Sequence, residues 1–155
     1  MKILVLSDSH GNVENMVRAV ERESPQMLLH LGDCWRDGVR LAERFPDIPL
    51  EQVPGNCDFR TRAEPQKLLL IKGRRVLLCH GHTYGVKQSL ISAGLAADEL
   101  NLDVFLFGHT HKPLVSRRGM ALFLNPGSIG EYSRPTYGVL SIGPGLLDAC
   151  TVLLS

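Results

Sequence analysis

Five short segments of the chain carry histidine, aspartate or asparagine, and each follows an apolar run. They are Asp8-Ser9-His10, Gly32-Asp33, Gly55-Asn56-Cys57-Asp58, His80-Gly81-His82 and Gly108-His109-Thr110-His111. Imidazole, carboxylate and amide oxygen are ligands that suit borderline divalent metals such as Mn, Fe, Zn and Ni. Even two carboxylates, an amide and four histidines from these segments are too many for one tetrahedral ion. They suit two ions that share a bridging carboxylate.

These segments need a scaffold that brings them together, and the apolar runs before them predict one. Residues 2–7 and 27–33 are short continuous apolar runs, typical of strands buried on both faces, and residues 50–58 begin as a third strand. Residues 12–23 and 37–45 lie between these runs and are expected to be helical. This order predicts a parallel βαβ sheet. Ligands of open α/β sheets bind outside the carboxyl ends of the strands, so we expect the segments to converge there.

The second half of the chain predicts hairpins around one helix and one further buried strand. The expected elements are a hairpin over residues 67–81 that turns at Lys72-Gly73-Arg74, a helix over 87–100, a buried strand over 103–109, a hairpin over 113–128 that turns at Arg118-Gly119, and an antiparallel pair over 136–143 and 147–154. Two sheets follow, the first mostly parallel and the second mixed, with helices outside. Alternate side chains of an extended segment share a side, so we expect His109 and His111 to reach the same metal cluster.

Length, charge and cysteine usage exclude several classes of function. The chain has 155 residues, with 17 Lys plus Arg against 16 Asp plus Glu and a net charge of +1. This length predicts a single domain over residues 1–155. The near-neutral charge argues against strong binding of duplex nucleic acid or of a membrane surface, whereas a nucleotide-sized ligand is compatible. The first apolar run is too short for a signal peptide, and the four cysteines show no CxxC spacing, so we expect a cytoplasmic protein.

The ordered motifs DSHGN, GD, GNCD, HGH and GHTH, together with NPGS at Asn125–Ser128, resemble those of the calcineurin-like metallophosphoesterase superfamily. The likeness is closest to its small single-domain phosphodiesterase branch and covers nearly the whole chain. It implies an α/β fold, a four-layer α/β/β/α sandwich of two mixed sheets flanked by helices. It also implies a metal-dependent hydrolase that cleaves phosphate monoesters or diesters.

The resemblance implies a role for each motif residue. Asp8, His10 and His111 would hold one divalent ion, Asn56, His80 and His109 would hold the other, and Asp33 would bridge both. The two ions would bind the phosphoryl oxygens and a bridging hydroxide that attacks in line. Mn²⁺ is the expected metal, with Fe, Ni or Zn as alternatives.

Three residues are candidates for a catalytic role: Asn56, Cys57 and His82. Many family members carry histidine directly after the asparagine, as a general acid or transition-state donor, and this chain has Cys57 there. A thiol can donate a proton but does not stabilise negative charge as an imidazolium would. His82 either contacts the substrate phosphate or orients His80.

Each of these residues also has a structural interpretation. Asp8 and Asp33 could cap the helices that follow them, and Asn56 could be a turn residue after Pro54-Gly55. His30 is expected to make a buried hydrogen bond, and Ser128 to support a turn. Cys79 is expected to pack inward as a small hydrophobe.

Two functions of different classes remain open. The first is a phosphodiesterase for small phosphodiesters, which include nucleotides and other organophosphates. The second is a non-catalytic protein-binding scaffold of the same fold, like the retromer subunit related to this branch. The complete ligand set favours catalysis. A nucleotide-binding βαβ domain is excluded because no GxGxxG follows the first strand. A homo-oligomer through an exposed sheet edge or an apolar patch is compatible with the sequence.

Overall fold

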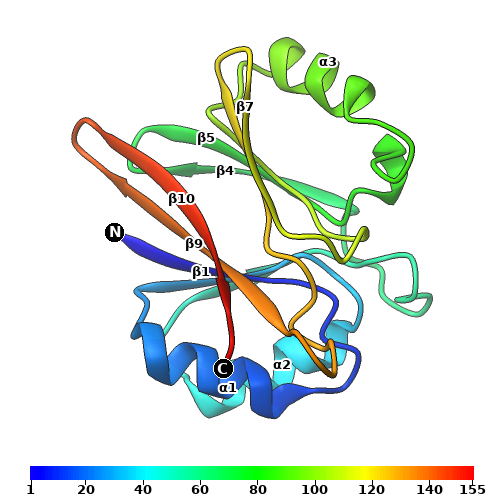
Figure 1. The fold of residues 1–155 in the computed structure, drawn as a ribbon, viewed down its shortest axis with the longest axis vertical. Coiled ribbons are helices and arrows are strands. Elements are labelled where there is room, and N and C mark those ends of the chain that lie inside the picture. Colours follow the sequence, from blue (N-terminus) through cyan, green and yellow to red (C-terminus); the bar gives the residue numbers. More distant parts are fainter.

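Two five-stranded sheets lie face to face and carry helices on their outer sides, in a computed structural model that describes residues 1–155 (Figure 1). The elements, in chain order, are β1 (Lys2–Leu6), α1 (Val13–Glu23), β2 (Met27–His30), α2 (Trp35–Arg44), β3 (Leu50–Gln52), β4 (Gln66–Ile71), β5 (Arg74–Cys79), the 3₁₀ turn η1 (His82–Tyr84), α3 (Ile91–Glu99), β6 (Val104–Leu106), β7 (Leu114–Arg118), β8 (Ala121–Asn125), β9 (Thr136–Gly143) and β10 (Leu146–Leu153).

Both sheets are mixed. The first has the order β10-β9-β1-β2-β3 and the second β4-β5-β6-β8-β7. In the first sheet β1, β2 and β3 are parallel, while β9 and β10 join antiparallel to the other edge of β1. The expectation of a mostly parallel first sheet is therefore wrong. The closing antiparallel pair itself is confirmed, as are the hairpins of β4 with β5 and of β7 with β8.

Three apolar layers hold the sandwich together. One lies between the sheets and includes Ile3 and Leu29 from the first sheet and Val76 and Leu106 from the second. A second packs α1 and α2 on the outer face of the first sheet. A third packs α3 on the outer face of the second sheet through small residues such as Ala93. The layers are therefore α/β/β/α, which confirms the expected fold.

Helix α3 is shorter than expected. It begins at Ile91 instead of residue 87, because the chain first completes the η1 turn and a further turn in which Gln88 N and Ser89 N donate to Gly85 O. Gly85 takes a left-handed conformation with φ 60°, which ends the 3₁₀ turn. None of the helices combines the length and apolar content that a membrane span requires.

Candidate metal centre

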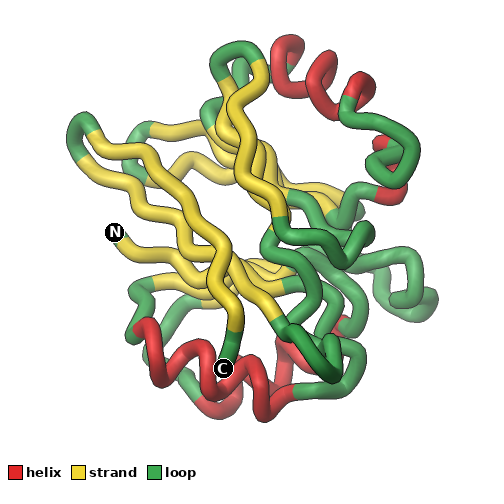
Figure 2. The backbone as a smooth tube through the Cα atoms, viewed as in Figure 1, coloured by secondary structure: helices red, strands yellow, loops and turns green.

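The five histidine- and aspartate-bearing segments leave β1, β2, β3, β5 and β6 at their carboxyl ends. Figure 2 shows the loops that follow these strands gathered at one end of the two sheets. The sheet geometry thus brings together segments that are up to 101 residues apart, as the hydrogen bond from His109 N to Asp8 Oδ2 illustrates.

Asp8 lies at the centre of this region and is fully buried. Its Oδ2 accepts hydrogen bonds from Ser7 Oγ at 2.6 Å and from His109 N at 3.1 Å. Its Oδ1 makes no hydrogen bond and faces His111 Nε2 at 3.1 Å and His10 Nε2 at 3.8 Å. Asp8, His10 and His111 therefore form one group of potential metal ligands.

A second group consists of Asp8, Asp33 and His80. His80 Nε2 lies 3.5 Å from Asp33 Oδ2 and 3.8 Å from Asp8 Oδ1, and it makes no hydrogen bond. The other ring nitrogen, His80 Nδ1, lies 2.8 Å from Leu31 O. A carbonyl only accepts, so Nδ1 carries the proton in the neutral ring, and Nε2 presents a lone pair to the centre of the group.

The residues present fit bound cations. Asp8 Oδ1 and His80 Nε2 are two of only three buried side-chain polar atoms without a partner in the protein. A buried carboxylate oxygen or imidazole nitrogen without a partner is costly, and a divalent cation satisfies both. The ligand atoms of each group lie within 4.8 Å of one another. A set of imidazole nitrogens and carboxylate oxygens suits Mn, Fe, Zn or Ni, as expected from the sequence.

The charges of this centre shift the pKa values of its members. Burial by itself would raise the pKa of Asp33, but the neighbouring His80 imidazole and the hydrogen bond from the Cys57 amide outweigh burial and hold this pKa below its usual range. Burial would lower the pKa of His80, but the carboxylates of Asp33 and Asp8 raise it overall. For His82 and His109, burial and the neighbouring His80 both lower the pKa. These two imidazoles are therefore favoured in the neutral form.

The other predicted residues surround this centre. The ring of His109 lies 5.0 Å from that of His80, and the ring of His82 lies 5.5 Å from it. The hydrogen bond that His80 makes through its ring is with Leu31 O, and its ring packs beside that of His82. Cys57 N donates to Asp33 Oδ1 at 3.0 Å, and Asn56 is exposed with its side-chain amide 3.7 Å from Cys57 Sγ. The Asn56 side chain thus contacts the Cys57 thiol.

Five of the proposed ligands have a left-handed backbone: Asp8, His10, Asp33, His109 and His111, with φ between 44° and 70°. Such conformations are unfavourable for residues with a side chain and concentrate at functional sites. The expectation of an extended segment at His109 and His111 is therefore wrong. The two imidazoles approach different neighbours, since His111 faces Asp8 and His109 lies beside His80.

Two glycines allow the loops to approach one another. A Cβ at Gly108 would collide with Ser7 Oγ and Asp8 Oδ2, and a Cβ at Gly55 would collide with Asp33 Oδ1. Any side chain at either position would displace a carboxylate of the centre.

The capping interpretations do not hold. Asn12 caps α1 and accepts from Asn15 N, and Cys34 occupies the cap position of α2, so neither Asp8 nor Asp33 caps a helix.

The structural roles expected for other residues are confirmed. His30 and Cys79 are buried, and Ser128 Oγ donates to Asp8 O at 2.7 Å.

Several residues that contact the ligands or their loops were not predicted from the sequence. Asp58 accepts hydrogen bonds from three backbone N–H groups of the ligand loops. Asp37 accepts from Ser9 Oγ and Gly11 N, both at 2.7 Å. Glu131 Oε1 lies 3.4 Å from His111 Nδ1. Only Asp58 carried a signal in the sequence, because it lies within the GNCD motif.

An α/β/β/α sandwich whose strand ends bring histidines and buried carboxylates together has the ligand types of a divalent-metal centre. A family model described as the calcineurin-like phosphoesterase superfamily domain matches residues 1–144. The chain belongs to this superfamily and is a metal-dependent phosphoesterase.

Two relatives share this assignment. "Probable metallophosphoesterase YsnB" of Bacillus subtilis is 36% identical over 132 residues, which cover 83% of this chain and 75% of YsnB. "Phosphodiesterase YfcE" of Escherichia coli K12 is 33% identical over 154 residues, which cover 83% of this chain and 79% of YfcE.

Two solved structures share the fold. A conserved protein of Streptococcus pneumoniae TIGR4, described as a predicted phosphoesterase, aligns with a TM-score of 0.76 and 25% identity over 97% of both chains. Vps29 of Entamoeba histolytica, solved in complex with zinc, aligns with a TM-score of 0.76 and 20% identity over all of both chains. At that identity the likeness to Vps29 concerns the fold alone.

Proposed function

We propose that the chain is a phosphodiesterase that uses two divalent ions, Mn²⁺ foremost, to hydrolyse small phosphodiesters, nucleotides among them. The observation that carries the proposal is the pair of ligand groups that meet at the buried Asp8 carboxylate. In this proposal Asp8, His10 and His111 hold one ion, and Asn56, His80 and His109 hold the other. Asp33 bridges the ions, as the family resemblance implies, and Asp8 is the alternative bridge because it belongs to both groups.

The protein's own groups prepare the centre for this reaction. When bound, the ions would polarise the phosphoryl oxygens and activate the attacking water. Ser7 and the His109 amide fix the Asp8 carboxylate, and Leu31 O fixes the His80 ring. In this proposal His82 contacts the substrate phosphate, and Cys57 donates a proton to the leaving oxygen. In the metal-free protein, burial and the charge of Asp33 raise the pKa of the Cys57 thiol.

In this proposal residues 1–155 form one catalytic unit. The apolar layer between the sheets, which contains residues of both, supports this view. We also place the enzyme in the cytoplasm, because all four cysteines are free.

The second candidate is a non-catalytic protein-binding scaffold, which the fold likeness to Vps29 keeps in view. Metal binding alone does not separate the two candidates, because Vps29 was itself solved with zinc. The complete ligand set of this chain favours catalysis, and turnover decides between the two.

Hydrolysis of bis-p-nitrophenyl phosphate and of the monoester p-nitrophenyl phosphate would test the proposal. Metal-stripped protein would receive Mn²⁺, Ni²⁺, Zn²⁺ or Mg²⁺, beside a His109→Ala variant and an exposed control, Arg118→Gln. We expect metal-restored diester cleavage that His109→Ala abolishes and Arg118→Gln retains. No turnover with any metal, from protein that binds two ions per chain, would contradict the proposal and favour the scaffold.

A further inference from the structure

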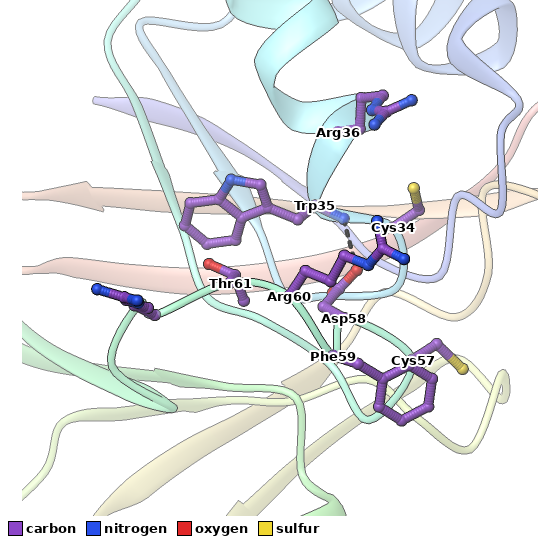
Figure 3. Close-up of a pocket in the computed structure, with 9 residues that line it drawn as sticks. Cys34, Trp35, Arg36, Cys57, Asp58, Phe59, Arg60 and Thr61 are labelled. Atoms are coloured by element: carbon purple, nitrogen blue, oxygen red, sulfur yellow. Dashed lines mark hydrogen bonds between the residues drawn. The ribbon is translucent and has the colours of Figure 1, made fainter.

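A pocket of about 620 Å³ opens beside the metal centre, between the start of α2 and residues 57–62 (Figure 3). Its volume is in the range of pockets that hold small organic ligands. Neither the family resemblance nor the ligand groups above assign a role to it.

Two residues that line the pocket are next to proposed metal ligands in the sequence. Cys34 and Cys57, which both line it, directly follow the proposed ligands Asp33 and Asn56. The Cys57 amide also donates to Asp33 Oδ1 at 3.0 Å. A diester bound at the centre would therefore have room for one of its two substituents in this pocket.

Two aromatic side chains line the pocket. Trp35 is half-buried, and Phe59 is 88% exposed. Figure 3 shows the indole and phenyl rings on either side of the Arg60 side chain in this view. A nearly fully exposed phenyl ring contributes little to the core. It is well suited to stack on a planar ligand such as a nucleobase.

Three arginines, Arg36, Arg60 and Arg62, line the same pocket. The lysine and arginine ion pairs of the structure lie elsewhere, at Lys2, Arg44, Lys67 and Arg74. Unpaired guanidinium groups in one pocket attract an anion and suit the geometry of phosphate.

The acidic residue of the pocket does not neutralise these arginines. Asp58 Oδ2 accepts from Asp33 N at 3.0 Å and from Gly55 N at 2.8 Å, and Oδ1 accepts from Trp35 N at 2.8 Å. Both carboxylate oxygens are therefore occupied by backbone N–H groups. The guanidinium groups are left to bind a ligand.

We propose that this pocket is a nucleotide subsite that stacks a nucleobase on Trp35 and Phe59 and binds a flanking phosphate with the arginines. The inference rests on the proposed function and narrows its substrate class to nucleotide diesters that carry a second phosphate. The flanking phosphate distinguishes this class from alkyl or aryl diesters, which present neither a base nor a second anion.

Binding can be measured without catalysis, because Trp35 is the single tryptophan of the chain. Its fluorescence would be titrated on metal-stripped protein with AMP, adenosine and inorganic phosphate. We expect saturable quenching by AMP at roughly tenfold lower concentration than by adenosine, and Phe59→Ala or Arg60→Gln should weaken AMP roughly tenfold. The matched controls are Met120→Ala, equally exposed at 88%, and Arg118→Gln. Absence of AMP quenching, or equal weakening in the controls, would overturn the subsite.

Catalysis supplies the second readout. Two diesters would be compared, thymidine 5′-(p-nitrophenyl phosphate) with and without a 3′-phosphate. We expect the 3′-phosphate to raise kcat/KM roughly tenfold, and Arg60→Gln to remove this preference while Arg118→Gln keeps it. Equal kcat/KM for both diesters would overturn the inference while their hydrolysis upheld the proposed function. If neither these diesters nor bis-p-nitrophenyl phosphate is cleaved with any metal, the proposed function fails, and the fluorescence titration alone decides the subsite.

Discussion

Cys57 occupies the position at which many members of this superfamily carry a histidine. Its amide holds Asp33 Oδ1, and its thiol lies beside the Asn56 side chain. In the metal-free protein, burial and the nearby negative charge of Asp33 raise the pKa of this thiol. A neutral thiol can protonate a leaving group but stabilises the charge of the transition state less than an imidazolium does.

The exchange Cys57→His tests this residue. We expect it to raise turnover of alkyl phosphodiesters by about tenfold and to change nitrophenyl diesters little, because only poor leaving groups need a strong proton donor. Steady-state kcat for a methyl diester and a nitrophenyl diester would be compared on the Mn²⁺-loaded protein. An equal effect on both substrates would contradict this role.

At the scale of the elements, the centre depends on loops that are tied to one another. Asp58, from the loop after β3, binds Asp33 N and Trp35 N, which precede and begin α2. The loops after β2 and β3 are therefore held at a fixed distance by one carboxylate. This arrangement positions both the proposed bridging ligand and the aromatic wall of the pocket.

Loss of this carboxylate should weaken the fold and the metal site together. Asp58→Ala leaves three backbone N–H groups without their acceptor, so we expect the free energy of unfolding to fall by about 2–4 kcal/mol. We also expect metal affinity to fall about 10–100-fold, because Asp33 loses its support. Urea denaturation and metal titration would measure both, with the exposed Asp47 as the matched control, Asp47→Ala. A variant that matched this control in both measurements would contradict the role of Asp58.

The sequence identified the candidate ligands but not the residues that support them, for a physical reason. Candidate ligands such as His80 and Asp33 lie in short motifs that directly follow strands. The apolar runs of these strands can be recognised in the sequence. The supports act across the chain, as between Asp37 and Gly11 or between Glu131 and His111, and no local pattern records such pairs. The position of β9 and β10 in the first sheet could not be predicted for the same reason. The pairing of β1 with β9 joins residues more than 130 positions apart. The left-handed loop at His109 and His111 depends equally on distant partners.

At the scale of the whole molecule, a buried histidine couples folding to pH. His30 is fully buried, its Nδ1 accepts from Gly32 N, and its Nε2 lies 3.0 Å from Ser9 Oγ, which in turn donates to Asp37. Burial lowers the pKa of His30 from 6.5 to about 4, against the opposing charge of Asp37. The folded protein therefore holds this imidazole neutral where the unfolded chain binds a proton.

This difference predicts a loss of stability in mild acid. Between pH 6.5 and 4 the unfolded state binds the additional proton, so the contribution of His30 to the free energy of unfolding falls by up to about 3 kcal/mol as the pH is lowered. Urea denaturation of metal-free protein at pH 7 and pH 5 would measure the slope. His30→Gln should have a shallower slope than the wild type, and an unchanged slope would show that His30 is not the responsible group.

If two ions share one carboxylate at the strand ends, a crystal structure of the Mn²⁺-loaded protein with anomalous diffraction will show this dinuclear centre. We expect two anomalous peaks about 3.5–4 Å apart. One should be held by Asp8, His10 and His111 and the other by Asn56, His80 and His109, with Asp33 between them. A single peak at full Mn²⁺ loading, or two peaks that share no carboxylate, would contradict it.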